Sequence, residues 1–372
     1  MRRLHIAWDN CFARRNQTGT GVYASRLLEH IASSNDIQLE VFAGWPEASS
    51  PQGRIARAMR FGGSLAWTHG RLPFLLRAKP FDLLHSPAFI SPLKAPCPRV
   101  VTVHDITYLL YPSHFAPWWV RYLNLTMPRV LGSSAAIICG SEHSKRDIVN
   151  AYGLSSQKVH VVPYGVDHCK FRPNVDLEAS WARSFGIREG YVLHVGELSQ
   201  RKNIPLLLRA VAYLRAKGRW EGRQLVLAGA GSPGMRGADE IQDVLRELDL
   251  GDIVVATGRV PDSQLPGLYR YASLLVMPSL YEGFGFPVLE SMAIGTPVVA
   301  SNISSLPEVA GDAAILVSPE DVAELANAID TVLKNKAIAE ELRQKGFSRA
   351  REFSWERAAA NTIAVYRSVA GT

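Results

Sequence analysis

The chain has 372 residues, of which 47% are hydrophobic and 20% are charged, and its formal net charge is +7. This composition excludes a disordered or fibrous protein, and the length predicts two globular domains. Residues 1–180 contain 20 Lys and Arg against 12 Asp and Glu, whereas the remaining residues contain 21 against 22. An excess of positive charge in the first half predicts an anionic partner there, which is a membrane surface, a phosphorylated acceptor or nucleic acid.

The N-terminal sequence MRRLHIAWDNCF has a short apolar run that Asp9 and Asn10 interrupt. A signal peptide has a longer apolar region, so these residues predict a first β-strand instead. Nowhere does the sequence contain the run of about 18 apolar residues that a membrane-spanning helix needs. The four cysteines form no C-x-x-C pair, which argues against a zinc site or a disulfide framework. We therefore expect a cytoplasmic protein with reduced cysteines.

Short apolar runs alternate with helical stretches twice along the chain. In the first half, helical patterns such as Gly21–Ile31 and Ser141–Tyr152 separate runs at 4–9, 37–44, 81–85, 99–105, 135–141 and 158–163. In the second half, the runs are 191–196, 223–229, 252–258, 273–279 and 296–301. Strands that are apolar on both faces and alternate with helices predict an α/β fold with parallel sheets.

Residues 53–79 depart from this alternation, because they contain six Arg and Lys, no acid, and many apolar and aromatic residues. A basic amphipathic stretch of this kind can lie in a membrane interface. Trp118, Trp119, Arg121 and Tyr122 add to that tendency further along the chain. The alternative is a solvated pair of helices that packs its apolar side on the domain.

Two glycine motifs follow predicted strands. In GTGVYA (19–24), Gly19 and Gly21 open a helix, where free N–H groups favour an anion, although a structural tight turn explains the glycines equally well. The second motif, G-x-G-x-x-G at residues 229–234, is typical of dinucleotide binding. That fingerprint expects an acid at the end of the next strand, but this strand ends in Thr257 and Gly258. The sequence therefore argues against a dinucleotide enzyme.

Charged residues follow two other predicted strands. Arg201 and Lys202 lie in SQRKN (199–203), at a strand end where open α/β sheets bind ligands. They can pair with a diphosphate, or they can simply be solvated. His104 and Asp105 close the strand RVVTV. His104 is expected either to face a cleft or to be hydrogen-bonded within the core.

Glu282 and Glu290 lie eight residues apart in the segment 278–301, on either side of a Gly-Phe-Gly-Phe-Pro turn. Pro287 suits the first turn of a helix, so Glu282 is expected on a loop and Glu290 near the helix start. Two carboxylates that flank an anion site can hold the hydroxyls of a sugar and of a ribose. The alternative makes Glu290 a partner of the helix dipole and Glu282 a loop charge.

Together these motifs resemble retaining glycosyltransferase family 4, the large GT-B group. Glu282 and Glu290 resemble its E-x7-E motif. The resemblance also covers, in order, GTGVY, TVHDI (102–106), GSEHSKRDI (140–148), VPYGVD (162–167), GELSQRKN (196–203) and FSWERAA (353–359). It implies a GT-B fold, an α/β fold of two Rossmann-like parallel-sheet domains that face each other across a cleft. Residues 1–170 with the C-terminal helix 355–372 are expected to bind the acceptor, and residues 171–354 the nucleotide-sugar donor.

The resemblance also implies a role for individual residues. The residues implied in catalysis are His104 beside the transferring sugar, Arg201 and Lys202 at the departing nucleoside diphosphate, and Glu282 at hydroxyls of the donor sugar. The other residues implied in donor binding are Gly19 and Gly21 at the diphosphate, Arg259 and Val260 at the base, Phe284 and Gly285 near the sugar, and Glu290 at the ribose. At Glu197 the sequence departs from the arginine that many members carry, so phosphate binding rests more heavily on Arg201 and Lys202.

The implied reaction is hexosyl transfer with retention through an oxocarbenium-like state. The resemblance implies that the leaving diphosphate takes the acceptor's proton, so no separate base is expected. Neither a metal nor another cofactor is expected. The sequence also contains no D-x-D motif, by which the other main glycosyltransferase fold holds a divalent ion.

The pattern HD-I-T-Y-x-x-x-P-x-x-F (104–115) resembles members that use GDP-mannose in bacterial surface-polysaccharide synthesis. We therefore expect a lipid-linked or oligosaccharide acceptor at the inner face of the cell membrane. UDP-sugars and dTDP-rhamnose remain alternative donors, and a GT-B epimerase or a sugar-phosphate synthase remains an alternative enzyme. A nucleic-acid-binding protein is an alternative of another class, but the sequence contains no recognition module for nucleic acid.

Overall fold

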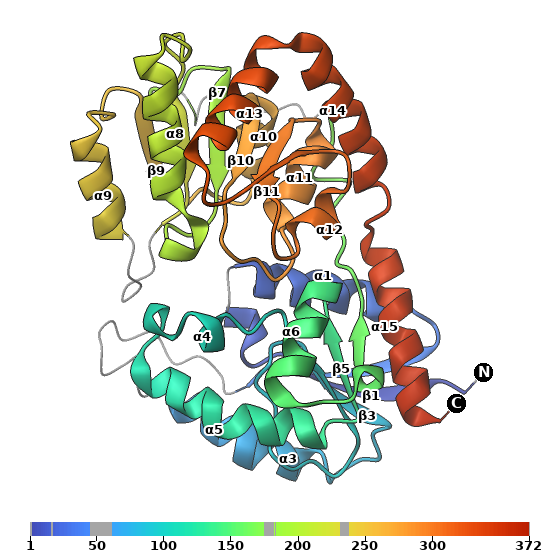
Figure 1. Cartoon of the computed structure of the whole chain (residues 1–372). Helices are drawn as coiled ribbons and strands as arrows, with labels where there is room; N and C mark the ends of the chain where they lie inside the picture. The colour runs from blue at the N-terminus through green and yellow to red at the C-terminus, as the bar shows by residue number, and fades with distance from the viewer. Residues whose placement is uncertain are drawn as a thin grey trace. The chain divides into compact units, whose positions relative to one another are not determined.

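The computed structural model describes residues 2–15, 18–44, 62–174, 182, 184–230 and 238–371. The chain divides into two compact units (Figure 1). The first unit consists of Met1–Ile106, Trp118–Gly165 and Trp355–Thr372, and the second consists of Thr107–Pro117 and Val166–Ser354. The short segment Thr107–Pro117 therefore groups with the second unit, although the sequence analysis had placed it in the N-terminal domain.

Six parallel strands form the sheet of the first unit, in the order β2-β1-β3-β4-β5-β6. They are β1 Leu4–Asp9, β2 Ile37–Phe42, β3 Leu83–Ser86, β4 Arg99–Thr102, β5 Ala136–Cys139 and β6 Val159–Val161. All residues of β3, β4 and β5 are buried, as expected for strands covered on both faces. Each strand overlaps the apolar run that predicted it, which confirms the parallel α/β sheet.

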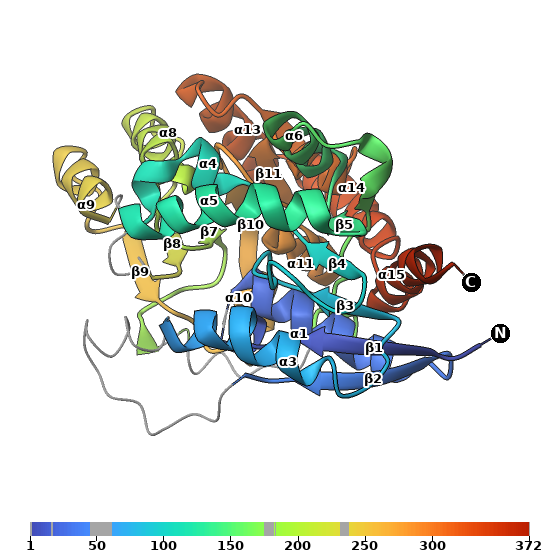
Figure 2. The same cartoon turned by 90° about the horizontal axis from the view of Figure 1, so that it is seen from below.

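The helices of the first unit include α1 Gly19–Ala32, the π-helix η2 Trp67–Arg71, α3 Leu72–Leu75, α5 Pro117–Ser133, α6 Glu142–Tyr152 and α15 Trp355–Ala370, with 3-10 turns η1 Ala13–Arg15 and η4 Ser156–Lys158. The chain returns to this unit through α15, which packs beside α1 and the sheet (Figure 2). There Tyr366 makes a 2.5 Å hydrogen bond to Nδ1 of the buried His85. Arg367 also donates to Asp36 at 2.9 Å, so polar contacts tie the last helix to the first unit.

The second unit has its own sheet of six parallel strands, in the order β12-β11-β10-β7-β8-β9. They are β7 Tyr191–Val195, β8 Leu225–Ala228, β9 Val254–Gly258, β10 Ala272–Met277, β11 Val298–Ser301 and β12 Ile315–Val317. The sequence analysis predicted the first five and missed β12. This edge strand has three residues, two of them only partly buried, so it lacks the long apolar run that identified the others.

The helices of the second unit are α4 Thr107–Leu110, α8 Ile204–Ala216, α9 Ala238–Glu247, α10 Leu265–Arg270, α11 Phe286–Ile294, α12 Leu306–Ala310, α13 Val322–Lys334 and α14 Lys336–Ala350, with 3-10 turns η3 Pro112–His114 and η5 Gln200–Lys202. Helices α8 and α13 pack side by side (Figure 1). Their apolar faces cover Val192, Leu274 and Val276 of the central strands. This burial is the main stabilising contribution to the scaffold that carries the loops described below. None of the helices in the described ranges has the length and apolar character that a membrane crossing requires.

Asp9, the last residue of β1, gives the first unit a pH-dependent stability. Its carboxyl is buried, and this burial raises the pKa to about 7, although the backbone N–H of Cys11 donates to it at 3.2 Å. As the pH rises from about 4 to 7, the unfolded chain releases the Asp9 proton while the folded protein retains it. The free energy of unfolding therefore falls across this window and stays at its lower value above it.

We expect Asp9→Asn to abolish this fall in the free energy of unfolding. The fall is on the order of 4 kcal/mol, at about 1.4 kcal/mol per pKa unit. Urea unfolding of both proteins at pH 5 and pH 8 measures it. The stability of the variant relative to the wild type should increase at the higher pH. An identical pH dependence in the two proteins would show that Asp9 is ionised in the fold.

Candidate functional site

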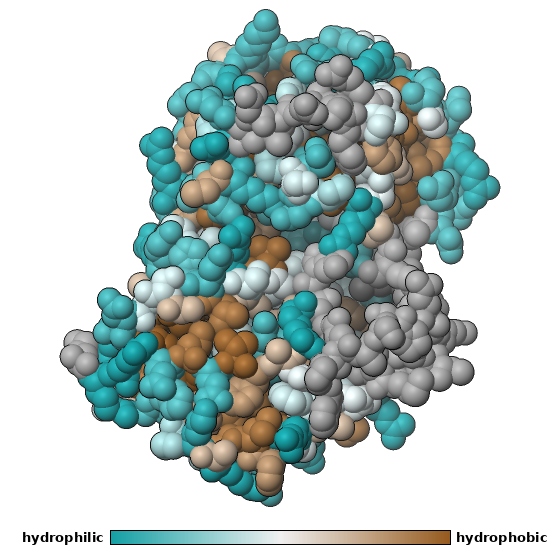
Figure 3. Space-filling view, turned by 180° about the vertical axis from the view of Figure 1, so that it is seen from behind, coloured by the Kyte–Doolittle hydropathy of each residue, from teal (hydrophilic) through white to brown (hydrophobic). Residues whose placement is uncertain are grey.

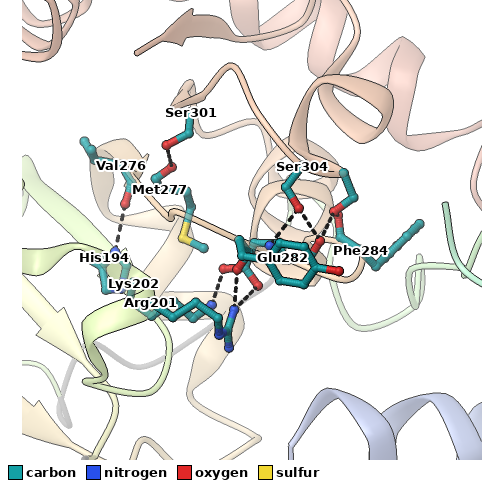
Figure 4. A network of polar contacts seen from close by, with 11 residues as sticks. His194, Arg201, Lys202, Val276, Met277, Glu282, Phe284, Ser301 and Ser304 are labelled. Atoms are coloured by element: carbon teal, nitrogen blue, oxygen red, sulfur yellow. Dashed lines mark hydrogen bonds and ion pairs between the residues drawn. The ribbon is translucent and has the colours of Figure 1, made fainter. Parts of the chain in front are cut away.

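Three charged side chains meet at the carboxyl end of the second sheet (Figure 4). Arg201 and Lys202 lie in η5, directly after β7, and Glu282 lies in the loop after β10, the strand that pairs with β7. One oxygen of Glu282 accepts from Arg201 Nη1 at 2.8 Å, and the other accepts from Lys202 Nζ at 2.5 Å. Lys202 and Glu282 are buried, being 5% and 7% exposed. We call Arg201, Lys202 and Glu282 the charged triad.

The triad keeps its carboxylate ionised. Burial alone would raise the pKa of Glu282, but the charges of Lys202 and Arg201 and the hydrogen bond from Lys202 outweigh it and lower the pKa to about 2. Burial lowers the pKa of Lys202, and Glu282 opposes this effect. The triad thus places two basic side chains and one carboxylate together, an arrangement that suits an anionic ligand.

Two serines hold the Glu282 loop in place. Ser304 Oγ accepts from the Glu282 N–H at 2.9 Å and lies 2.6 Å from the Glu282 carbonyl oxygen. Ser305 Oγ lies 2.9 Å from that oxygen and 2.7 Å from the carbonyl oxygen of Phe284. The N–H of Leu280 also donates to the carbonyl oxygen of Arg201 at 2.8 Å, which joins the loop to η5. The Glu282 carboxylate therefore projects from a backbone that several hydrogen bonds position.

His194, a fully buried residue of β7, lies beside Lys202 (Figure 4). Its Nδ1–H donates to the carbonyl oxygen of Val276 at 3.0 Å (Figure 4). Burial and the charge of Lys202 lower its pKa to about 4, so the imidazole is neutral. A Cβ on Gly196 would lie 3.2 Å from Lys202 Nζ and 3.5 Å from His194 Nε2, so glycine provides the space in which Lys202 lies.

The first glycine of the G-x-G-x-x-G motif has a structural role. A Cβ on Gly229 would lie 1.8 Å from the carbonyl oxygen of Gly196, and Gly229 has a φ of +147°. Glycine is therefore required for β8 and the loop after β7 to approach each other this closely. Gly231 and Gly234 lie outside the described residues. Close backbone approach accounts for Gly229 without a dinucleotide.

Glu290 lies on α11, and Pro287 lies in the first turn of this helix, as predicted. The Glu290 carboxylate accepts a hydrogen bond from Tyr269 at 2.7 Å. Burial raises the pKa of Glu290 to about 7, although Tyr269 and the charge of Lys170 lower it. A carboxyl with this pKa is partly protonated near neutral pH.

The other predicted donor-binding residues of the second unit lie at ends of its elements. Arg259 and Val260 follow β9, and Arg259 is exposed whereas Val260 is 9% exposed. Phe284 is buried and lies edge-on to Phe286, with 5.4 Å between the ring centroids. Gly285 is the N-cap of α11 with a φ of +116°, a backbone conformation that favours glycine. These residues lie at the carboxyl ends of strands or at a helix N-terminus, where ligands bind in such folds.

The remaining predicted residues belong to the first unit. Gly19 and Gly21 lie in the first turn of α1, so the glycine motif forms the helix start itself. His104 follows β4, and its two ring nitrogens lie 3.1 Å from the carbonyl oxygen of Pro87 and 2.8 Å from the hydroxyl of Tyr164. Because a carbonyl only accepts, Nε2 carries the hydrogen and Nδ1 accepts from Tyr164. Burial lowers the pKa of His104 to about 4, against the opposing effect of Asp105.

The sequence analysis missed the partners that position these residues. They are Tyr164 for His104, Tyr269 for Glu290, and Ser304 and Ser305 for the Glu282 loop. Tyr164 lies in VPYGVD, a segment already identified as a motif, so its position was a usable signal. The serines lie more than 20 residues from Glu282 in a segment without a recognised pattern, and no sequence signal pointed to them.

Two family models match this chain. The model described as Glycosyl transferases group 1 matches residues 179–350, and that described as Glycosyltransferase Family 4 matches residues 18–170. O-antigen chain mannosyltransferase B of Escherichia coli is 31% identical over 385 residues and aligns with 94% of this chain and 96% of its own length. MMP alpha-(1->4)-mannosyltransferase of Mycolicibacterium hassiacum is 30% identical over 418 residues, with 98% of both chains aligned.

Among solved structures, sucrose-phosphate synthase of Thermosynechococcus elongatus matches with a TM-score of 0.79 and 22% identity, covering 99% of each chain. At this identity the match establishes the fold alone, and it confirms the predicted GT-B architecture together with the two six-stranded parallel sheets. The relatives that are at least 30% identical over nearly the whole chain establish the family. The chain therefore belongs to glycosyltransferase family 4 and has the GT-B fold.

Proposed function

We propose that this glycosyltransferase transfers mannose from GDP-mannose, with retention, to a lipid-linked or polysaccharide acceptor in cell-surface glycan synthesis. The observation that carries the proposal is the charged triad at the carboxyl end of the second sheet, of which Lys202 and Glu282 are buried. The choice of mannose is supported by the names of the two relatives described above, both of which are mannosyltransferases. The pattern of residues 104–115 favours the same donor.

The proposed chemistry depends on charge and positioning. Arg201 and Lys202 neutralise the departing diphosphate, and the burial of Lys202 strengthens its interaction because little water screens it. Glu282 forms ion pairs with both Arg201 and Lys202. When donor binds, the phosphate oxygens share the cations with Glu282, and the carboxylate can accept from sugar hydroxyls. In the first unit, His104 is neutral near pH 7 and its Nε2–H donates to the carbonyl oxygen of Pro87, so we do not propose it as a charged acid.

A thermal-shift screen of the purified protein against GDP, UDP, dTDP and NAD tests the donor assignment. A ligand that binds only the folded protein adds roughly 2.7 kcal/mol to its stability at a hundredfold excess over its Kd. We expect GDP to raise the melting temperature. If UDP or dTDP raised the melting temperature instead, the donor would carry that nucleotide and not GDP. If NAD alone raised it, the proposed transferase activity would be contradicted. Product analysis with GDP-mannose alone, and then with sugar phosphates, distinguishes the transferase from an epimerase or a sugar-phosphate synthase.

Glu290→Ala is expected to weaken GDP binding about tenfold, because a buried hydrogen bond to a ribose hydroxyl contributes roughly that factor. In the wild type, GDP binding should strengthen as the pH rises through about 7, because the ionised carboxylate is the better acceptor for the ribose. Calorimetric titration with GDP at pH 6 and pH 8 measures both effects. A Kd in Glu290→Ala equal to that of the wild type would exclude the ribose role.

Turnover is expected to continue in the presence of a chelator. The proposed site neutralises the diphosphate with Arg201 and Lys202, and the sequence contains no D-x-D motif. Initial rates with and without excess EDTA, after dialysis against chelator, measure this independence. A loss of turnover that Mg²⁺ or Mn²⁺ restores would show that a metal ion takes part.

The location at an anionic membrane surface is also part of the proposal. Figure 3 shows apolar residues gathered on one face of the first unit. Large apolar side chains exposed in this unit include Phe74, Trp118 and Leu125, and the guanidinium of Arg71 lies 5.6 Å from the Phe74 ring centroid. Aromatic residues beside cations suit the interface of anionic lipids. In a flotation assay the protein should rise with anionic but not neutral liposomes, and an unbound protein would contradict this location.

A further inference from the structure

The segment Thr107–Pro117 contains two short helices, α4 and η3. It follows His104 closely in sequence and precedes most of α5, and these neighbours belong to the first unit. The segment itself groups with the second unit, which carries the charged triad. Its contacts there are made with the two loops that hold the triad, and neither the sequence motifs nor the proposed chemistry accounts for them.

His114 contacts the first of these loops. Its side chain is buried, with 4% of its surface exposed, and Nε2 lies 2.9 Å from Oε1 of Gln200. Because the amide oxygen only accepts, the imidazole donates this hydrogen bond through Nε2–H. Gln200 is the first residue of η5 and directly precedes Arg201 and Lys202. The hydrogen bond therefore holds the turn that presents both cations.

Tyr111 contacts the second loop. Its ring stacks on His114, with 5.4 Å between centroids and 16° between planes, and it lies 6.2 Å from the ring of Tyr281. Tyr281 directly precedes Glu282, and its carbonyl oxygen accepts from Arg201 Nη1 at 2.6 Å. One stacked pair of side chains thus touches both the turn that carries the cations and the loop that carries the carboxylate.

Backbone hydrogen bonds within the segment fix this pair. The Tyr111 N–H donates to the carbonyl oxygen of Thr107 at 2.8 Å, and the His114 N–H donates to that of Tyr111 at 3.0 Å. Pro112 lies in the first turn of η3, where its fixed φ favours the turn. These backbone contacts fix the positions from which the side chains of Tyr111 and His114 project.

We propose that Tyr111 and His114 are positioning residues of the donor site, which hold the Arg201–Lys202 turn and the Glu282 loop in register. This inference rests on the proposed function, because it assigns the donor to the triad. It extends the donor site to a segment that the sequence places beside His104. Loss of the His114–Gln200 hydrogen bond should loosen both loops and weaken diphosphate binding without removing any charge from the site.

Hydrogen exchange measures the positioning directly, without a ligand. The wild type is compared with His114→Ala, Gln200→Ala and the double variant, and Leu110→Ala is the matched control because Leu110 is a 47% exposed residue of the same segment. We expect faster exchange of residues 199–203 and 279–285 in both single variants, no further increase in the double variant, and no change in the control. Unchanged exchange in His114→Ala would overturn the inference. Gln200 is exposed, so Gln200→Ala keeps the test valid if His114→Ala fails to fold.

Calorimetric titration with GDP and UDP then separates the inference from the proposed function. Both single variants should bind the nucleoside diphosphate about tenfold more weakly, the double variant no more weakly than either, and His114→Gln, which can still donate, should recover part of the affinity. Equal affinity in the wild type and both single variants would overturn the donor-site role. A wild type that binds neither nucleotide would instead contradict the proposed function, while hydrogen exchange still decides whether His114 positions the loops.

Discussion

Lys202→Ala is expected to lower kcat/KM by on the order of a hundredfold or more. Lys202 is buried, so little solvent screens the interaction of its ammonium group with a diphosphate. After truncation to alanine, water does not easily take the place of the ammonium group. The charge on the leaving group grows as the bond to the sugar breaks. The loss should therefore appear in kcat as well as in KM, because the interaction is stronger in the transition state than in the ground state.

The matched control for this variant is Lys217→Ala, which removes an exposed lysine of the same unit. Initial rates over a range of donor concentrations, with the melting temperature of each variant, distinguish a lost interaction from a lost fold. Lys202→Arg retains the charge but changes its geometry, so it should recover only part of the rate. A Lys202→Ala enzyme with wild-type kcat/KM would exclude the triad as the diphosphate site.

Glu282→Ala is expected to lower kcat/KM by a similar factor for a different reason. The negative charge of the Glu282 carboxylate does not stabilise the leaving diphosphate. The carboxylate instead pairs with Arg201 and Lys202 and is placed to accept hydrogen bonds from sugar hydroxyls. Its removal leaves two cations without their partner, so a nucleoside diphosphate should bind at least as tightly as it does to the wild type. The combination of slower turnover with retained diphosphate affinity separates Glu282→Ala from Lys202→Ala, which should lose both.

Calorimetry with the nucleoside diphosphate, next to steady-state kinetics with the nucleotide sugar, measures this contrast. Removing one partner of a buried ion pair also costs about 3–5 kcal/mol of stability, so assays belong well below the melting temperature of the variant. Glu282→Gln is the more conservative variant, because the glutamine side chain has nearly the same shape as glutamate and its amide can still form a hydrogen bond with a sugar hydroxyl. If both Glu282 variants lost diphosphate affinity as strongly as Lys202→Ala, the role of the carboxylate would be to position Arg201 and Lys202 and not to bind the sugar.

The structure also changes the interpretation of His104. The sequence placed this residue at a strand end and left open whether it faces a cleft or is bonded in the core. Both ring nitrogens have partners, Pro87 and Tyr164, and Tyr23 lies edge-on to the ring with 4.9 Å between centroids. Gly140 permits this arrangement, because a Cβ there would come within 2.8 Å of the Tyr164 ring. Tyr164 and Pro87 thus fix the tautomer of His104, which no local pattern reveals.

The sequence by itself determined the parallel α/β sheets, because strands buried on both faces must be apolar throughout, and it determined which loops follow those strands. It also identified Arg201, Lys202, Glu282 and Glu290 as candidates. Only the tertiary structure decided which of them meet. Strand β10 pairs with β7, so the loop that carries Glu282 comes beside the turn that carries Lys202, 80 residues away in the chain. Local periodicity reports burial and not strand order, so neither this pairing nor the contact of His114 with Gln200 was available before the fold was known.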